Sequence, residues 1–510
     1  MLRTLFKRIY RHRASFGERH VIAIILGSAL TAMGLSLAIG LQQSVWFDEA
    51  YSIFLAKQPW GQLLYLTSVD THPPLYYALL KVWGDVFGWS ELVLRSLSVL
   101  ALGASVAMGG LLIKRLFGAR VAAVAVMILA ISPFLLRYGF EIRMYAIGSL
   151  VGIAATYVLV LAEDAKTRAV QLRRYALYAV LVALGMYLFY YMAFLWIAHA
   201  SWLAWMGWRR ERSLIRAVWK PWLAAYLGAV ILYLPWIPTF LGQLGNGALT
   251  SVAQSLTLDN LISIVSFYTV YEPLWRLGPI MSVVVLFALV VIGRLGMRAY
   301  RSLEKRQRPY FVLLAMYVLV PVLLLTLIGF VRPMYLERYV SHVAIGASLA
   351  LGVAVAVVWP RIGRVGKWAV GIFVVTLLVG VVQLAAYGNY NFQRTLHPAI
   401  KQAAQLATPC NDNSKVVAGD PYAAIELLYY VQNCPVYFYE PSIILTGGYA
   451  PLNGSEFQLR DPESQLADTE TVYYIYYDQP RSDLSVNRQL VERTTFDSLT
   501  IDVLSAAPRD

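Results

Sequence analysis

The sequence reads VIAIILGSALTAMGLSLAIGL at residues 21–41, and VWFDEAY follows at residues 45–51. The first stretch has the ~20 apolar residues that a helix needs to cross a bilayer. The second places two adjacent carboxylates just beyond the end of that helix. Ten further apolar runs follow at 92–113, 121–137, 144–162, 175–190, 192–208, 221–241, 278–297, 310–330, 339–359 and 368–388. We therefore expect an α-helical polytopic membrane protein with about eleven transmembrane helices.

The composition agrees with this prediction. Of 510 residues, 59% are hydrophobic and 14% are charged, which excludes an ordinary soluble globular chain, a disordered one and a disulfide-rich secreted module. The formal net charge is +14, and 27 of the 43 Lys and Arg residues lie in alternate connections between the runs. Those segments are 1–20, 114–120, 163–174, 209–220, 294–308 and 361–367. Because positive residues gather on the cytoplasmic side, we expect a multi-pass protein of the plasma (inner) membrane with a cytoplasmic N-terminus.

The tail is expected to be a separate extracytoplasmic domain. An odd number of spans places it outside, and its 8 basic against 15 acidic residues fit that side and exclude a nucleic-acid partner. Strand-like runs at 415–418, 436–439, 472–477 and 499–504, with a helix near 422–431, predict a small α/β domain. The predicted domains are therefore 1–388, a transmembrane catalytic domain, and 389–510.

The chain has two cysteines, Cys410 and Cys434, and both fall in the tail. Two cysteines in a region placed outside the cytoplasm predict one disulfide. A pair of unrelated buried thiols is the alternative.

The first outer loop, residues 42–90, is long and contains an acidic pair. Asp48 and Glu49 are adjacent, so on a helix their side chains diverge by about 100° and serve different purposes. One carboxylate can face a substrate while the other binds a metal, caps the backbone or supports its neighbour. An ordinary N-cap role for Asp48, ahead of a short helix 49–57, is the alternative.

The same loop continues as Asp70-Thr71-His72-Pro73-Pro74-Leu75. The two prolines suit the first turn of a helix, with Asp70 or Thr71 as its cap. Four apolar residues follow at helical spacing and predict a stripe lying in the headgroup plane, namely Tyr76, Leu80, Trp83 and Phe87. The loop is thus expected to form two juxtamembrane helices.

Two further polar clusters lie at the outer ends of spans, residues 137–145 and 332–339, and Arg95 lies four residues into the second span. Singly, such charges are typical of snorkelling or positioning side chains. Together, several arginines near two or three carboxylates indicate a binding site for a lipid-linked phosphate.

The sequence resembles the GT-C glycosyltransferases, and within them the protein O-mannosyltransferase and lipid A aminoarabinose transferase branch. Phe47-Asp48-Glu49 after the first span and Asp70-Thr71-His72-Pro73-Pro74-Leu75, which is similar to the D-x-H-P-P-L of the mannosyltransferases, carry the resemblance. Arg95 and the arginine- and tyrosine-containing outer ends add to it. The resemblance covers roughly residues 20–200; an inserted lumenal domain of the mannosyltransferase kind is not found, so a protein acceptor is not implied.

The resemblance implies an enzyme that transfers a hexose or pentose from a polyprenyl-phosphate donor to an acceptor outside the cytoplasm, with inversion. The class of acceptor, a lipid, a glycan or a protein, is left open by the sequence. Asp48 would be the general base on the acceptor hydroxyl, and Glu141 or Asp70 the second acid. His72 stands where aminoarabinose transferases carry a lysine, which implies a phosphate contact. The residues implied by the resemblance, by role, are Asp48, Glu49 and Glu141 for catalysis; Arg95, His72, Arg143 and Arg338 for the donor phosphate; and Asp70, Tyr145 and Tyr339 as support for the acceptor or a metal.

The chemistry can also be argued from the residues alone. A polyprenyl phosphate is already a good leaving group, since its second pKa is about 6. The protein must then remove a hydroxyl proton, align the reactants and stabilise charge on the phosphate. Asp48 could remove the hydroxyl proton. Arginines, or a divalent Mg²⁺ or Mn²⁺ held by Asp48 and Glu141, could stabilise the charge on the phosphate.

Two other function classes compete with the enzyme. A multispan lipid or sugar transporter or flippase predicts charges near mid-span and inverted repeats, and a scaffold gives no reason for acids, histidine and arginines to converge. His199, among tryptophans of the sixth span, is interpreted as an interhelical hydrogen-bonding residue. The outer loop 242–277 is a candidate lid over the acceptor.

Overall fold

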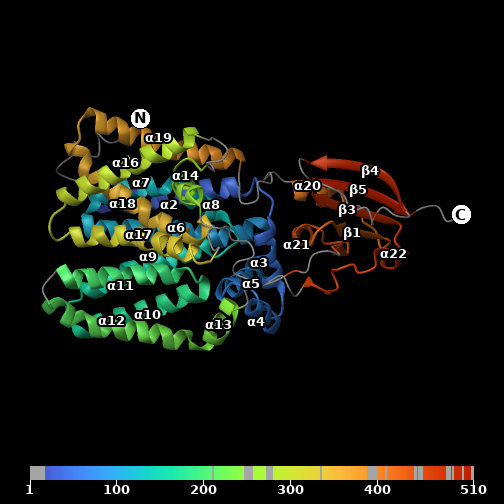
Figure 1. The fold of residues 1–510 in the computed structure, drawn as a ribbon, viewed down its shortest axis with the longest axis horizontal. Coiled ribbons are helices and arrows are strands. Elements are labelled where there is room, and N and C mark those ends of the chain that lie inside the picture. Colours follow the sequence, from blue (N-terminus) through green and yellow to red (C-terminus); the bar gives the residue numbers. More distant parts are fainter. Residues whose placement is uncertain are drawn as a thin grey trace. The chain divides into compact units, whose positions relative to one another are not determined.

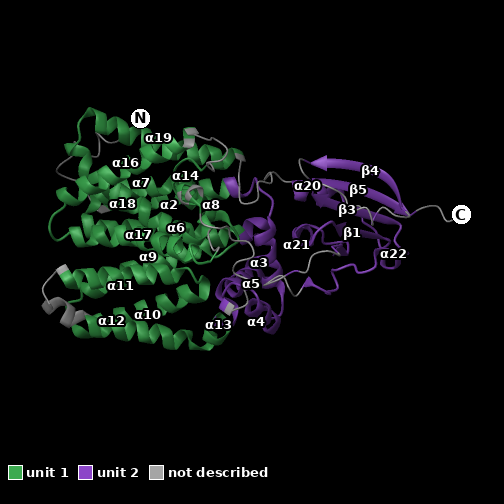
Figure 2. Ribbon diagram, viewed as in Figure 1, with its two compact units in different colours: residues 1–38, 95–240, 252–386 green, residues 39–94, 241–251, 387–510 purple. Residues whose placement is uncertain are grey.

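The computed structural model describes residues 18–209, 212–245, 257–271, 279–332, 336–387, 399–407, 410–440, 445, 452–477, 484, 488–496 and 499–506 (Figure 1). The chain divides into two compact units (Figure 2). Unit 1 comprises residues 1–38, 95–240 and 252–386, and unit 2 comprises 39–94, 241–251 and 387–510. The predicted lid falls largely on residues 246–256 and 272–278, outside the described ranges, although residues 258–269 of that loop form a helix.

Unit 1 is helical. Its elements are α2 (Glu18–Gly40), α6 (Glu91–Phe117), α7 (Ala119–Ala130), α8 (Pro133–Phe140), α9 (Tyr145–Glu163), α10 (Arg168–Leu188), α11 (Met192–Arg209), α12 (Arg212–Tyr233), the 3₁₀ turn η1 (Leu234–Trp236), α13 (Ile237–Gly245), α14 (Leu258–Thr269), α16 (Pro279–Ser302), α17 (Arg308–Gly329), η3 (Glu337–Val340), α18 (Val343–Val358), η4 (Trp359–Arg361) and α19 (Arg364–Tyr387). α2, α6 and α13 continue into unit 2 at one end.

Among the described residues, eight helices are long and apolar enough to cross a membrane, or nine if the bent pair α7 and α8 forms one span. The chain is thus a helical polytopic membrane protein. The runs predicted as the fifth and sixth spans do form helices, α10 and α11, but these helices are less apolar than the eight candidate spans. α10 begins with Arg168, Arg173 and Arg174, and α11 includes His199 and four tryptophans, so their mean hydropathy is lower. The predicted third span is bent by 63° at Ile131–Ser132.

Small residues allow the helices of unit 1 to pack closely. α7 and α18 meet at Gly352, where an added Cβ would lie 2.3 Å from the Cα of Ala125. Such close approach of backbones is how helices associate in lipid, where burial of apolar surface supplies little driving force. Most of α18 is buried as a result.

His199 links three helices of unit 1. Its ring nitrogens lie 3.0 Å from the hydroxyl of Thr156 on α9 and 2.9 Å from that of Tyr178 on α10. Burying such a polar group costs free energy unless the group is hydrogen-bonded. The structure agrees with the interpretation of His199 as an interhelical hydrogen-bonding residue.

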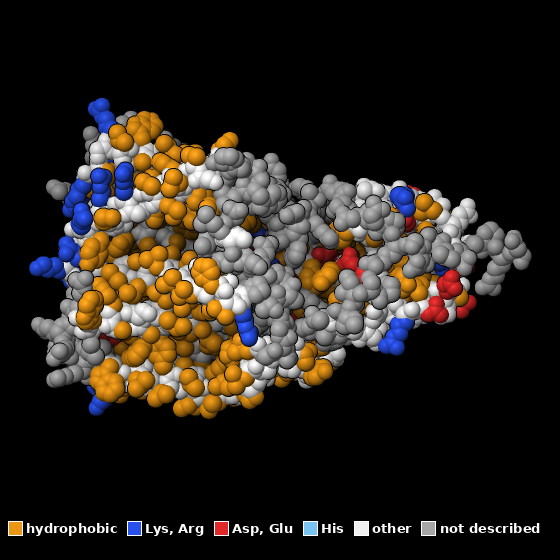
Figure 3. All heavy atoms as spheres, viewed as in Figure 1, with side chains coloured by type: hydrophobic (Ala, Val, Ile, Leu, Met, Phe, Trp, Pro, Cys, Tyr) orange, Lys and Arg blue, Asp and Glu red, His pale blue; other side chains and the backbone are white. Residues whose placement is uncertain are grey.

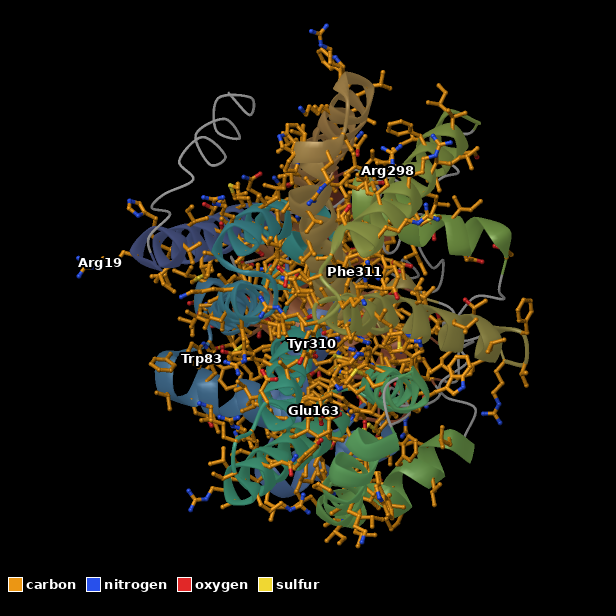
Figure 4. The ribbon with its side chains drawn as sticks, turned by 90° about the vertical axis from the view of Figure 1, so that its left-hand side faces the viewer. Arg19, Trp83, Glu163, Arg298, Tyr310 and Phe311 are labelled. Atoms are coloured by element: carbon orange, nitrogen blue, oxygen red, sulfur yellow. A yellow bond between two sulfur atoms is a disulfide. The ribbon has the colours of Figure 1, made fainter. Side chains whose placement is uncertain are left out.

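Figure 3 shows hydrophobic side chains along the helices of unit 1 and Lys and Arg side chains gathered at one end of them. Lys114 and Arg115 are in the last turn of α6, and Arg301 is in the last turn of α16. Figure 4 looks onto that end and labels Tyr310. Its hydroxyl lies 3.4 Å from the carboxylate of Asp164, which also pairs with Arg115 at 2.9 Å.

Unit 2 joins three short helices of the first loop to the C-terminal sheet domain. Its elements are α3 (Phe47–Lys57), α4 (Trp60–Val69), α5 (Leu75–Phe87), α20 (Ala399–Leu406), β1 (Ser414–Ala418), α21 (Pro421–Tyr430), β2 (Val436–Phe438), α22 (Pro462–Gln465), β3 (Thr471–Tyr477), β4 (Arg488–Phe496) and β5 (Leu499–Ala506). The five strands form one mixed sheet in the order β2-β1-β3-β5-β4. β1 runs parallel to β2 and β3, and β5 is antiparallel to β3 and β4.

The four predicted strands and the helix of the tail are confirmed by β1, β2, β3, β5 and α21. β4 was not predicted, because the sequence RQLVERTTF is largely solvent-exposed and lacks a clear apolar alternation. A disulfide joins Cys410 and Cys434, the pairing that the sequence predicts, with Cα atoms 5.9 Å apart.

The predicted headgroup stripe of α5 is wrong for two of its four residues, Tyr76 and Leu80. Tyr76 and Leu80 are buried inside unit 2, because this face of α5 packs on α3. The apolar side chains that α5 exposes are Leu79, Val82, Val86 and Phe87. The additional helix α4 exposes Trp60, Leu64 and Tyr65.

Candidate active site

The acidic pair lies in the first turn of α3. This helix begins at Phe47 with Trp46 in the N-cap position, so the N-cap role considered for Asp48 is wrong. The backbone N–H of Trp46 donates to the Glu49 carboxylate at 3.3 Å. Glu49 therefore caps the helix. Asp48, on a different side of the same turn and only 5% exposed, is not needed for that purpose.

Helix α21 of the sheet domain holds the backbone ahead of the acidic pair. The N–H of Val45 donates to the Tyr430 hydroxyl at 2.7 Å, and that hydroxyl is also bonded to the carboxylate of Glu91. The rings of Phe47 and Tyr422 meet edge to face, with centroids 4.7 Å apart. Two links from α21 thus fix the start of α3.

Asp70 ends α4 and orients the histidine of the loop. Its carboxylate lies 3.2 Å from Nδ1 of His72 and accepts the hydroxyl of Tyr77 at 3.3 Å. The proposed capping of α5 by Asp70 or Thr71 is wrong, since that helix begins at Leu75 without a side-chain cap. Asp70 is buried and His72 is partly exposed, so the pair can present an imidazole in a fixed orientation.

Unit 1 contains a buried ion pair between Arg137 and Glu141. Nη2 of Arg137 and Oε1 of Glu141 are 3.2 Å apart, with side chains 1% and 0% exposed. The guanidinium groups of Arg95 and Arg137 both lie over the ring of Phe140, at 5.4 and 5.2 Å from its centroid. Two cations stacked on one ring beside a single carboxylate favour an anion at this place.

The turn between α8 and α9 fixes the backbone of this cluster. The carbonyl of Glu141 accepts the Ser98 hydroxyl at 2.6 Å and the backbone N–H of Arg143 at 2.7 Å. The side chain of Arg143 is buried as well. α6 and the α8–α9 turn therefore hold Arg95, Glu141 and Arg143 in one part of unit 1.

Aromatic rings link this cluster to the residues before α18. Tyr145 contacts Tyr138 at 5.0 Å and Phe189 at 5.7 Å, measured between ring centroids. Phe189 reaches Tyr339 at 6.4 Å, and Tyr339 stacks on Tyr191 at 4.2 Å. Tyr145 and Tyr339 are thus parts of one aromatic chain.

Glu337 and Arg338 lie in η3, close enough to the cluster to interact with it. Burial raises the pKa of Glu337 and the nearby Glu141 carboxylate adds to this, while Arg338 and Arg137 act in the opposite direction. Arg338 is buried. Glu337 therefore interacts electrostatically with Arg338 and with both members of the Arg137–Glu141 pair.

The site residues named from the sequence lie in two groups. Unit 2 holds Asp48, Glu49, Asp70 and His72, and unit 1 holds Arg95, Glu141, Arg143, Tyr145, Arg338 and Tyr339. Arg137 and Phe140 also belong to the group in unit 1; the sequence placed them in the polar cluster 137–145 but gave neither an individual role. The i,i+4 spacing of Arg137 and Glu141 on a helix is the signal that could have revealed the ion pair.

The donor set does not fit a bound metal. In the described part of the chain, no three His, Cys, Asp or Glu residues form a group that could hold a metal ion. Glu141, one of the two proposed ligands, already pairs with Arg137. We therefore derive no step through a metal.

Residues 71–238 match the family described as dolichyl-phosphate-mannose-protein mannosyltransferase. The match covers about a third of the chain, and it agrees with the resemblance carried by Asp70-Thr71-His72-Pro73-Pro74-Leu75. The matched region includes His72, Arg95, Glu141, Arg143 and Tyr145.

Solved structures share this fold. ArnT from Cupriavidus metallidurans, bound to undecaprenyl phosphate, has a TM-score of 0.62 and 12% identity over 97% of this chain and 100% of its own. Archaeoglobus fulgidus oligosaccharyltransferase with Zn and sulfate has a TM-score of 0.51, 12% identity, and coverage of 89% and 68%. The same organism's AglB, with an inhibitory peptide and a dolichol-phosphate, has a TM-score of 0.52, 12% identity, and coverage of 91% and 70%. No curated protein matches the chain in sequence.

Proposed function

We propose that this protein is a glycosyltransferase of the GT-C type that uses a polyprenyl-phosphate sugar as donor, inverts the transferred sugar and has Asp48 as its general base. The observation that carries the proposal is the division of labour in the first turn of α3, where Glu49 accepts the N–H of Trp46 and Asp48 does not serve as the cap. Asp48 is a buried carboxylate in the first turn of α3, and α21 holds the backbone just ahead of it. The carboxylate is therefore fixed well enough to accept a proton from a bound hydroxyl.

In the proposed reaction, the acceptor hydroxyl gives its proton to the Asp48 carboxylate while its oxygen attacks the anomeric carbon of the donor. The bond between that carbon and the phosphate oxygen breaks, and polyprenyl phosphate leaves with the electron pair. A single displacement inverts the anomeric centre. Positioning and neutralisation of the phosphate are then the main tasks left for the protein.

The proposed donor site consists of Arg95, Arg143, Arg338 and His72. Support comes from the two guanidinium groups stacked on Phe140 beside one carboxylate, and from the undecaprenyl phosphate and dolichol-phosphate in the similar structures. We propose that Arg137 belongs to this site and that Glu141 keeps the arginines in place rather than binding a metal. Asp70 orients His72.

The first loop has three helices, α3, α4 and α5, where the sequence predicted two. We also propose eleven spans, a cytoplasmic N-terminus, and domains at 1–388 and 389–510 in the plasma membrane. α10 and α11 are consecutive, so counting both as spans or neither leaves the side of the C-terminus unchanged. The Lys and Arg residues at one end of unit 1 (Figure 3) support this orientation.

The test is sugar transfer by purified Asp48→Asn protein, supplied with a panel of radiolabelled polyprenyl-phosphate sugars and a membrane extract, with and without chelator. We expect transfer to be lost while expression and thermal stability stay as in the wild type. Asp85→Asn is the matched control, because Asp85 is an exposed acid on α5 that pairs with Lys81 of the same helix. Full transfer by Asp48→Asn would refute the assignment.

A further inference from the structure

Unit 2 contains a cavity of about 210 Å³ between the first-loop helices and the sheet domain. α3 and α4 form one wall, and residues 452–457, which follow β2, form the other. The residues that line the cavity include Tyr51, Phe54, Gln62, Ser455, Glu456 and Phe457. None of these residues was assigned a role in the donor site or in proton transfer.

Three aromatic rings, with Leu66 and Leu452 beside them, form the apolar part of the cavity. Tyr51 and Phe54 are 6.4 Å apart between centroids and inclined by 24°, and Phe54 meets Phe457 edge to face at 6.1 Å. The electron-rich faces of aromatic rings that line a cavity attract the C–H face of a flat, weakly polar ring. A volume below the ~300 Å³ usual for ligand pockets limits the occupant to about one such ring.

Polar groups stand at the rim of the same cavity. Gln62 and Glu456 are exposed, Ser455 is half-buried, and they offer an amide, a carboxylate and a hydroxyl. A saccharide ring has one apolar face surrounded by hydroxyl groups, so it matches both the rings and the rim. A phosphate does not, because the Glu456 carboxylate would repel it, and a lipid chain would leave the polar rim groups unused.

The cavity lies next to the proposed base along one helix. Tyr51 follows Asp48 by three residues on α3, about 4.5 Å along the axis and on a neighbouring face. Phe54 is a further turn away. A glycan lying along α3 would place one ring in the cavity while a hydroxyl of the adjoining residue reaches Asp48.

We infer that this cavity is a subsite for a phosphate-free saccharide ring of the acceptor, and that the acceptor is accordingly a glycan. The inference rests on the proposed function, since it concerns the acceptor of the same reaction. It assigns the sheet domain a part in acceptor recognition through Glu456 and Phe457.

The test measures binding of methyl glycosides of glucose, mannose, galactose and glucosamine to the purified full-length protein by saturation-transfer NMR at millimolar concentration. At least one glycoside is expected to bind saturably, and its 6-phosphate to bind more weakly. Glu456→Gln removes a charged hydrogen-bonding partner and is expected to weaken binding about tenfold. Phe457→Ala is expected to have a similar effect, while Phe87→Ala, an exposed phenylalanine of α5 outside the cavity, leaves binding unchanged.

Absence of saturable binding by all four glycosides, or equal binding by wild type, Glu456→Gln and Phe457→Ala, would overturn the inference. Glu456→Gln changes an exposed side chain and keeps the test valid if Phe457→Ala fails to fold. Asp48→Asn is expected to bind the glycosides normally. Loss of transfer by Asp48→Asn without glycoside binding by the wild type would therefore remove the subsite and leave the proposed function intact. Glycoside binding by the wild type together with normal transfer by Asp48→Asn would remove Asp48 as the base and leave the subsite intact.

Discussion

Removal of Arg137 is expected to destabilise unit 1 strongly. Its guanidinium lies 3.2 Å from the Glu141 carboxylate, and both side chains are fully buried. At an effective dielectric constant near 20, two unit charges at such a distance attract each other by about 5 kcal/mol. Breaking a buried pair by removing one partner costs about 3–5 kcal/mol, because the other charge stays buried without compensation. We therefore expect Arg137→Met to lower the free energy of unfolding by about 3–5 kcal/mol.

The measurement is reversible unfolding of the purified protein in mixed micelles, as a double-mutant cycle of Arg137→Met, Glu141→Gln and the double variant. The double variant is expected to be more stable than either single variant, since it leaves neither Arg137 nor Glu141 buried without its partner. Arg115→Met is the control: Arg115 pairs with Asp164 at 2.9 Å, but both side chains are about 40% exposed, so the loss is expected to be at most about 1 kcal/mol. Losses below 1 kcal/mol for both single variants, or strict additivity in the cycle, would refute this reasoning.

Two further predictions concern packing and the sheet domain. Gly352→Ala would force a Cβ against the backbone of Ala125 and is expected to lower the free energy of unfolding by about 1–3 kcal/mol. Gly371→Ala, with open space around its Cα, is the control and is expected to be neutral. Thermal unfolding of both variants is the measurement, and equal stability would contradict the close packing. Cys434→Ser removes the disulfide between residues 24 apart in sequence and is expected to lower the free energy of unfolding of this domain by about 3 kcal/mol. The measurement is protease cleavage of the tail, which is expected to increase in the variant and equally in the reduced wild type. An unchanged cleavage rate in both would show that the disulfide does not stabilise this domain.

Local patterns predicted most of the elements, because they depend on apolar period and length. The long apolar runs became helices, and the strands 472–477 and 499–504 correspond to β3 and β5 within a residue or two. α4 was missed because WGQLLYLTSV lies between two stronger signals, Pro59 and the Asp70 loop. The number of spans was less certain from sequence, since His199 and the arginines of α10 lower the mean hydropathy of helices that are otherwise well formed.

The site could be predicted as a set of residue types but not as contacts. The adjacent acids of α3 indicated that Asp48 and Glu49 have different tasks, and the capping bond of Glu49 agrees. The face that α5 buries depends on α3, which packs on it, and a stripe in one helix cannot reveal its partner. The contacts from Tyr145 to Tyr339 join residues nearly 200 positions apart, so only the folded chain brings them together.

The rate of polyprenyl phosphate release by Asp48→Asn, at saturating donor and in the presence of an acceptor-containing membrane extract, tests the central claim most directly. A general base contributes about 10²–10⁴-fold to a rate, so the variant is expected to be slower than wild type by that factor, while Asp85→Asn matches the wild type. A variant rate within twofold of the wild type would contradict the assignment of Asp48 as the base.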